Sequence, residues 1–158
     1  MAQGNVHGGR LLVENFYPAI WNVLHDGVIV AVDGAAPGTL CLDISIDYLR
    51  ERFSEPGEFI QVLLIGCTRF AYRQSTEAEF TAELPGIVAQ PPEILSASMI
   101  DGLCEVECSD GVLEIVASGG AVRLDTGRAV ALQELIAVAD SYWKEWSERA
   151  KKAREKTP

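Results

Sequence analysis

Apolar and polar residues alternate along several short stretches of this chain. Between Thr39 and Ile46, leucine or isoleucine occupies every second position. A period of two residues indicates a β-strand with one buried face. The apolar stretch Val28–Val32 precedes it, and the turn-rich segment 33–38 lies between the two. We predict that these two strands form an antiparallel hairpin.

Turn signals at regular spacing divide a later segment into four short strands. Asp-Gly at 101–102, Asp-Gly at 110–111 and Gly-Gly at 119–120 supply the positive φ that tight hairpin turns require. The sequence therefore predicts a four-stranded antiparallel meander with strands Ile94–Ile100, Leu103–Ser109, Val112–Ala117 and Ala121–Asp125. In the second strand, the alternation places Cys104, Val106 and Cys108 toward the core and Glu105 and Glu107 toward water.

The segments between the hairpin and the meander are less regular. Asp47–Phe53 has the composition of a short helix with a capping residue at its head. Phe59–Arg73 is apolar at successive positions, which predicts one long central strand covered on both faces. Gly66 interrupts this run and indicates a bulge.

Residues 74–93 give the weakest pattern. Ser75 and Thr76 resemble a helix start, after which Phe80 and Leu84 would bury one side and Pro85-Gly86 would end the helix. Long irregular segments in compact domains often carry function.

From about Ala129 the period changes to three and four residues, which is typical of a long amphipathic helix. We expect the helix to fray after about Ala150, where basic residues complement its C-terminus. Its apolar stripe contains Leu132, Leu135, Ile136, Ala139, Tyr142, Trp143 and Trp146.

Together these elements predict an α+β fold. We expect an antiparallel, curved, meander-rich sheet of about seven strands, covered by the long C-terminal helix. A sheet of this size could close into a partial barrel. The domain organisation that follows is a flexible tail at 1–9, which contains His7, a single α+β domain at 10–150 and a basic tail at 151–158.

Charge is distributed unevenly along the 158 residues. The net charge is −10, but residues 1–143 hold 7 Arg, no Lys and 20 acids, which gives −13, and residues 144–158 carry +3. The acidic body disfavours nucleic acid as a partner, because phosphate binding needs cations. It suits a protein partner with a basic surface. No apolar run reaches the ~18–20 residues that span a bilayer, and no secretory signal precedes the domain, so the expected location is the cytoplasm, away from the membrane.

His25-Asp26 is the most compact polar group within an apolar stretch. A histidine near its reference pKa can act as a base or bind a metal. In the alternative interpretation, Asp26 begins a turn and His25 bonds to nearby backbone. Carboxylates of Asp33, Asp43 and Asp47 could join His25, and the set His25, Asp43 and Asp47 defines an alternative hypothesis of a metal-assisted hydrolase or ligand-binding barrel.

Most other catalytic patterns are absent from the sequence. There is no Gly-rich phosphate loop, nucleophile elbow, H-E-x-x-H or paired C-x-x-C. Four cysteines in a chain of this length are too few for a disulfide scaffold, and we expect reduced, mostly buried thiols. The sequence favours a protein that is not an enzyme and needs no cofactor.

Two tryptophans lie three residues apart on the predicted C-terminal helix. Large aromatic residues on an apolar stripe usually pack inward. Trp146, near the basic end, could instead contact a partner. A third hypothesis is therefore a scaffold subunit that dimerises through this helix, and the sequence leaves monomer and dimer equally open.

The stretch from Asn15 to about Arg73 resembles small immunity-type proteins of bacterial polymorphic toxin systems. In that group an aromatic arm with a proline leads to a His-Asp-small-residue turn and then to a hairpin. The corresponding residues here are Phe16-Tyr17-Pro18, Trp21 and Leu24-His25-Asp26-Gly27-Val28-Ile29. The resemblance implies a non-enzymatic protein that binds and neutralises a toxin, and the acidic body would suit a basic nuclease toxin.

The leading hypothesis is thus a soluble binding module that uses acidic loops. The residues expected to contact a basic partner are Glu77, Glu79, Glu83, His25 and Asp26.

Overall fold

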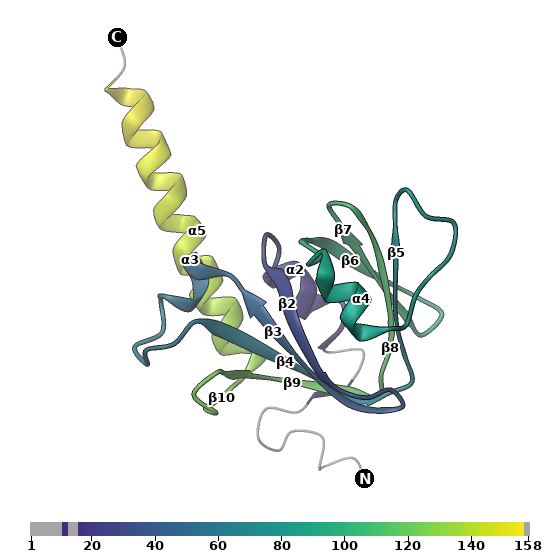
Figure 1. The fold of residues 1–158 in the computed structure, drawn as a ribbon. Helices are drawn as coiled ribbons and strands as arrows, with labels where there is room; N and C mark the ends of the chain where they lie inside the picture. The colour runs from purple at the N-terminus through teal and green to yellow at the C-terminus, as the bar shows by residue number, and fades with distance from the viewer. Residues whose placement is uncertain (1–10, 13–15, 157–158) are drawn as a thin grey trace.

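The computed structural model describes residues 11–12 and 16–156. Its antiparallel strands form two sheets that pack around a shared core, and a long C-terminal helix stands along one side (Figure 1). The predicted α+β class is confirmed. The tail 1–9 and His7 lie outside the described residues. Within these residues, no helix is long and apolar enough to cross a membrane.

The larger sheet contains the predicted hairpin at one edge. Ile29 pairs with Ile44 and Val32 with Leu42, as the alternation indicated. In the described residues this sheet has six strands, in the order β1 (Leu11–Leu12), β9 (Gly119–Leu124), β4 (Phe59–Cys67), β3 (Gly38–Ser45) and β2 (Val28–Gly34), with β10 (Ala129–Val130) added to β9.

The smaller sheet contains most of the predicted meander. Its order is β5 (Arg69–Gln74), β8 (Gly111–Val116), β7 (Leu103–Cys108) and β6 (Ile94–Ile100). In β7, the side chains of Cys104, Val106 and Cys108 are buried as expected. The four cysteines are free thiols, three of them buried.

The strand predicted as the fourth of the meander belongs to the larger sheet, so this part of the prediction is wrong. Gly119 and Gly120 do not form a hairpin turn; they begin β9, which pairs with β4. The Phe16 ring lies against Gly120, where an added Cβ would overlap it. The two glycines therefore permit a close approach of ring and backbone, rather than a turn.

Phe59–Arg73 is two strands, not one. The chain leaves the larger sheet after Cys67 and enters the smaller sheet at Arg69. Gly66 has a φ of +59°, which marks the change of direction. β4 does lie centrally, but burial alternates along it, so the expectation that both of its faces are covered is wrong.

The helices also depart from the predicted bounds. The short helices are α2 (Ala19–Val23), α3 (Asp47–Arg50) and α4 (Leu84–Ala89), and the C-terminal helix is α5 (Leu132–Glu155). No helix starts at Ser75; instead Pro85 lies in the first turn of α4, where proline is tolerated. α5 begins after residues 129–130 because these pair with β9, and it continues beyond Ala150.

Backbone and side-chain bonds join α2 to the edge of the smaller sheet. The amide of Asp26 donates to Ile94 O at 2.8 Å, and that of Ile94 to Gly27 O at 2.8 Å. The Asn22 carboxamide accepts from Ala97 N at 2.9 Å and donates to Ala97 O at 3.3 Å. Beside this junction Trp21 is fully buried, which confirms that it anchors the N-terminal arm. The two sheets stay open rather than closing into one barrel.

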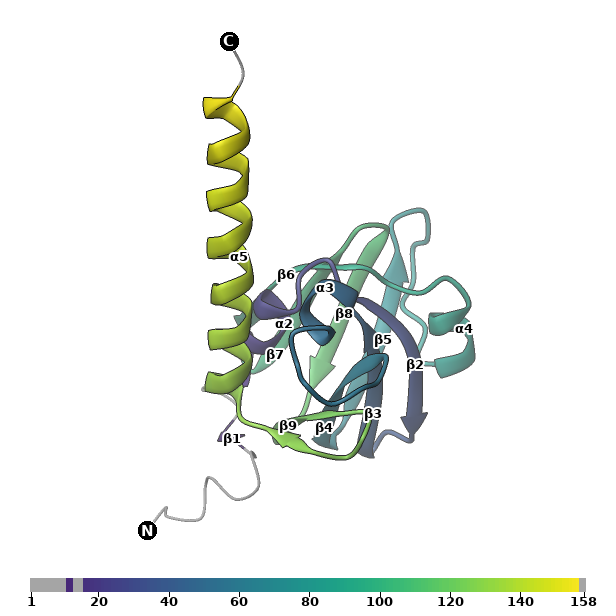
Figure 2. The same ribbon diagram turned by 90° about the vertical axis from the view of Figure 1, so that its left-hand side faces the viewer.

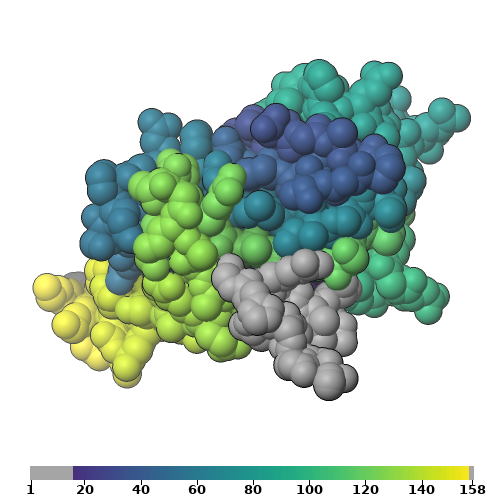
Figure 3. Space-filling model, turned by 90° about the horizontal axis from the view of Figure 1, so that it is seen from below, coloured from purple at the N-terminus to yellow at the C-terminus, as the bar shows by residue number. Residues whose placement is uncertain are grey.

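A buried ion pair fixes α3 against the larger sheet. Arg50, only 2% exposed, donates to Asp125 Oδ1 at 2.9 Å and to the carbonyl oxygens of Glu55 at 2.8 Å and Phe59 at 3.1 Å. Asp125 Oδ2 accepts from the backbone amides of Glu58 at 2.7 Å and Phe59 at 3.0 Å. Any Cβ on Gly57 would overlap this pair. Seen from below, the loop after α3 lies beside the turn between β9 and β10 (Figure 3), and an ion pair joins the loop to the turn.

Removing Arg50 should cost far more than removing a nearby exposed arginine. Arg50→Ala leaves Asp125 charged and unpaired, and we expect it to lower the free energy of unfolding by about 3–5 kcal/mol. The matched control is Arg52→Ala, which removes the exposed pair with Glu145 and should cost about 0–1 kcal/mol. Urea unfolding measures both variants, and equal losses would contradict the prediction.

The same ion pair predicts loss of stability in acid. Burial raises the pKa of Asp125, but hydrogen bonds from Glu58, Arg50 and Phe59 outweigh it and hold the pKa at about 2. Because the folded-state pKa lies below the unfolded one, the contribution is full above pH ~4 and disappears as the pH falls toward ~2. The loss is about 2 kcal/mol at most, and Asp125→Asn should remove this component from a series of urea titrations.

Candidate functional site

The sequence-predicted site residues lie in two separate places. Glu77 and Glu79 line one cavity beside β5, whereas His25 and Asp26 lie at the end of α2, next to α5. Glu83 is exposed at the start of α4 and does not line the cavity. The structure therefore brings together only part of the predicted set.

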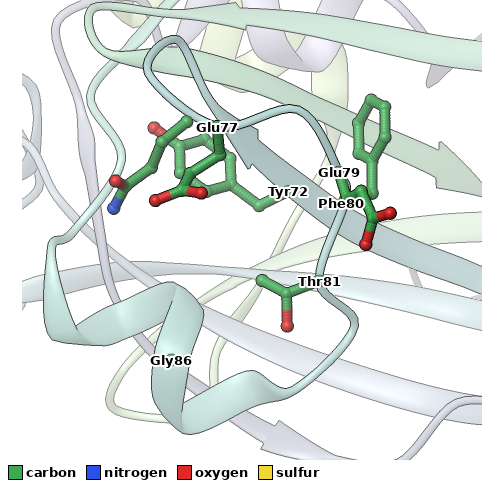
Figure 4. A pocket seen from close by; sticks show the side chains of 7 residues that line it. Tyr72, Glu77, Glu79, Phe80, Thr81 and Gly86 are labelled. Atoms are coloured by element: carbon green, nitrogen blue, oxygen red, sulfur yellow. The ribbon is translucent and has the colours of Figure 1, made fainter.

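The cavity beside β5 has a volume of about 360 Å³. Its floor is the end of β5, and its walls are the loop after β5 and the helix α4 (Figure 4). Two backbone hydrogen bonds between Tyr72 and Thr81, at 2.9 and 2.8 Å, fold this loop back over the strand. The lining residues are Tyr72, Gln74, Glu77, Glu79, Phe80, Thr81 and Gly86.

Three polar side chains that line the cavity offer hydrogen-bond acceptors. Tyr72 is 3% exposed, and its hydroxyl has no hydrogen-bond partner among the described residues. Gln74 Nε2 donates to Gln90 Oε1 at 2.7 Å, which leaves Gln74 Oε1 available. The side chain of Glu77 lies beside that of Tyr72 (Figure 4). Burial, followed by the charges of Cys108 and Asp110, raises the pKa of Tyr72 and keeps its hydroxyl protonated.

The carboxylates at this site have no cation of their own. Within the described chain, no Lys, Arg or His lies within ion-pair distance of Glu77, Glu79 or Glu83. Two arginines lie beside the site but do not pair with these carboxylates. Arg69 and Arg73 lie 5.3 and 5.5 Å from the Phe80 ring centre, and Arg73 Nη1 donates to the backbone oxygen of Glu77 at 3.4 Å. The cavity thus has unpaired glutamate side chains, with two guanidinium groups on the neighbouring Phe80 ring.

His25 is held in place by its backbone and by α5. Its Nδ1 lies 2.8 Å from Asn22 O, and its ring stacks on Trp143 at a centroid distance of 5.3 Å. In the neutral ring this bond places the proton on Nδ1. Asp26 occupies the left-handed region at φ +74°, and its Oδ2 is 3.9 Å from His25 Nε2. The turn and the bond to nearby backbone match the non-catalytic interpretation.

The structure does not assemble the alternative metal set. Asp43 Oδ1 accepts from Gln61 Nε2 at 2.8 Å on the outer face of β3, and Asp47 is exposed at the start of α3. Across the described residues, no group of three His, Cys, Asp or Glu side chains could hold a metal ion. The described residues therefore provide no metal centre around His25 for the hydrolase hypothesis.

Sequence reasoning missed Tyr72 and Gln74. Their place in the cavity depends on the pairing of Tyr72 with Thr81 and on the bond between Gln74 and Gln90, and neither contact has a local signal. The one available clue was the aromatic residue Tyr72 at the end of a strand, next to the long acidic loop.

His25→Ala should affect stability rather than partner binding at the cavity. It removes the stack on Trp143 and the bond to Asn22, and we expect a loss of about 1 kcal/mol in the free energy of unfolding. Urea unfolding followed by tryptophan fluorescence measures this loss. His25→Gln keeps a donor but not the ring, and it should recover part of the loss.

In a comparison with known proteins, no protein-family model, no curated protein and no solved structure matches the chain.

Proposed function

We propose that this chain is a non-enzymatic binding module that holds a basic segment of a partner protein at the cavity beside β5. The observation that carries the proposal is the pair of carboxylates, Glu77 and Glu79, which line a cavity and have no cation within ion-pair distance in the described chain. Unpaired carboxylates in a hollow favour a ligand that brings its own positive charge.

The chemistry of the lining fits a lysine side chain. An ammonium group has three donors and no acceptor. Tyr72, Gln74 and Glu77 all line the cavity, and Tyr72 Oη, Gln74 Oε1 and the Glu77 carboxylate are three acceptors. The ring of Tyr72 offers apolar surface to the aliphatic stem of such a side chain. An arginine could also pair with a glutamate here, because a carboxylate offers two coplanar acceptors to its fork.

The charge of the whole domain supports the same type of partner. A body with a charge of −13 attracts a basic protein over a distance of about 10 Å at ordinary salt and speeds its approach. In this proposal the partner is a basic toxin and the chain is its immunity-type inhibitor. The location is the cytoplasm, where four free thiols would stay reduced.

The test compares two triple variants with the same change of charge. Glu77→Gln, Glu79→Gln and Glu83→Gln neutralise the two carboxylates that line the cavity and the exposed Glu83 at the start of α4. The matched control, Glu51→Gln, Glu58→Gln and Glu107→Gln, neutralises three exposed carboxylates elsewhere that form no ion pair in the described chain. Each protein serves as bait in a lysate of the native host at low and high salt, and captured proteins are identified by mass spectrometry.

We expect a basic protein to be captured by the wild type and by the control, and to be lost at high salt. With the purified partner, the first triple variant should bind about tenfold more weakly or worse, and Tyr72→Phe should weaken binding by a smaller factor. Equal loss in both triple variants would mean that only the net charge matters, and the cavity would then have no special role.

A further inference from the structure

The distal half of α5 stands away from the rest of the molecule. The helix contacts α2 and α3 as far along as Trp143 and then projects beyond both of them (Figures 1 and 2). Trp146 lies where the helix leaves the body, and it is 50% exposed. An isolated helix as short as this projecting segment is only marginally stable in water.

The apolar stripe of α5 does not end where the body ends. Ala139, Trp143, Trp146 and Ala150 follow one another at intervals of four, three and four residues. This spacing keeps all four on one face of the helix. Ala139 is buried against the body and Trp143 is half-buried, whereas Trp146 faces solvent. The stripe therefore continues past the surface that covers its first part.

A groove between α2 and α5 extends this face toward the start of the helix. It has a volume of about 320 Å³, and its surface is mainly apolar. Asp140 stands at its rim and forms no ion pair in the described chain. The lining residues are Ala19, Asn22, Val23, His25, Ile136, Ala139, Asp140 and Trp143.

The two ends of the exposed part of α5 carry opposite charge. Five of the last eight described residues are basic and one is acidic: Arg149, Lys151, Lys152, Arg154 and Lys156, with Glu155. Toward the other end lies the exposed carboxylate of Asp140, and Asp47 and Glu51 are exposed on and just after α3, which packs against α5. Within α5, Asp140 and the basic residues are thus separated along the helix axis.

We propose that a second copy of this chain covers the stripe, with its α5 antiparallel to the first. This arrangement places Trp146 of each copy against the small Ala150 of the other. It also lays the basic end of each helix along the α2–α5 groove of its partner. The aliphatic stem of Arg154 then packs on apolar groove residues while its guanidinium meets Asp140.

The register that places Trp146 of one copy against Ala150 of the other also places residue 154 of one copy near residue 140 of the other. These two positions are 14 residues apart, so they occupy the same place in the heptad and flank the core of an antiparallel pair. Within one chain they are about 21 Å apart along the helix and cannot form an ion pair. A twofold axis produces each contact twice.

This interface is independent of the cavity beside β5. It uses α2 and α5, and no residue that lines that cavity. Because only part of one helix and one groove are covered on each copy, the dimer should be weak, in the range expected for interfaces below about 1,200 Å².

The first test is sedimentation equilibrium of the full chain from about 10 μM to about 1 mM. The average mass should rise with concentration from 17.2 kDa toward twice that value. Trp146→Glu should weaken the dimer at least about tenfold without unfolding the protein, which circular dichroism checks. A wild-type mass that stays at the monomer value, or a dimer that Trp146→Glu leaves intact, would overturn the proposal.

The second test uses charge reversal. Asp140→Arg and Arg154→Asp each place like charges at both symmetric contacts, so each variant alone should be monomeric. An equal mixture of the two restores both pairs of opposite charge, and it should form a heterodimer at least as well as the wild type.

The matched controls for charge reversal lie on the opposite face of α5. Glu148→Arg and Lys151→Asp also reverse one charge each, and neither should change the mass curve. If the mixed variants fail to associate, the antiparallel register is excluded. If the control variants change the mass curve as much as the charge reversals at residues 140 and 154, the contact is only unspecific charge attraction. Either result overturns the proposal.

Discussion

The ion pair between Arg50 and Asp125 sets the position of everything built on α3. It is buried, and both side chains make further hydrogen bonds with the backbone of residues 55–59. Such additional bonds offset the cost of removing the two charges from water. Once α3 is fixed, Tyr48 packs on Tyr142 with ring centres 4.4 Å apart, and Arg52 bonds to both oxygens of Glu145 at 2.6 and 3.1 Å. The direction in which α5 leaves the body therefore depends on a contact between α3 and the turn after β9.

Local pattern was sufficient for some elements and misleading for others. The β2–β3 hairpin, the alternation along β7 and the apolar stripe of α5 follow from periods of two and of three to four residues, because those periods reflect which side is buried. The division of Phe59–Arg73 and the departure of β9 do not follow from such patterns. Both depend on long-range pairing, and Gly119-Gly120 has the composition of a turn although its role is to admit the Phe16 ring. A glycine pair in the sequence indicates either a close approach of another group or an unusual backbone conformation, but it does not indicate which of the two.

The candidate site shows the same division. The acidic loop stood out because it was long and had no firm element, and two of its three glutamates do line a cavity. Tyr72 and Gln74 were invisible because a strand residue gives no sign of the loop that will fold back over it. His25-Asp26 was conspicuous in the sequence as an adjacent pair, yet the backbone of Asn22 and the ring of Trp143 account for the histidine. Adjacency along the chain proved a poor guide to shared chemistry.

The Asn22 carboxamide that bonds to Ala97 has a consequence for how the protein behaves at high concentration. β6 is the outermost strand of its sheet, and Leu95 and Ile100 on it are about half exposed. An uncovered apolar edge strand is a template on which other chains add strands and aggregate. One amide side chain supplies the same donor and acceptor that an incoming strand would bring, and it occupies the middle of the edge. Together with the backbone of Asp26 and Gly27, which bonds to Ile94 at the start of β6, this side chain occupies the edge against a further strand.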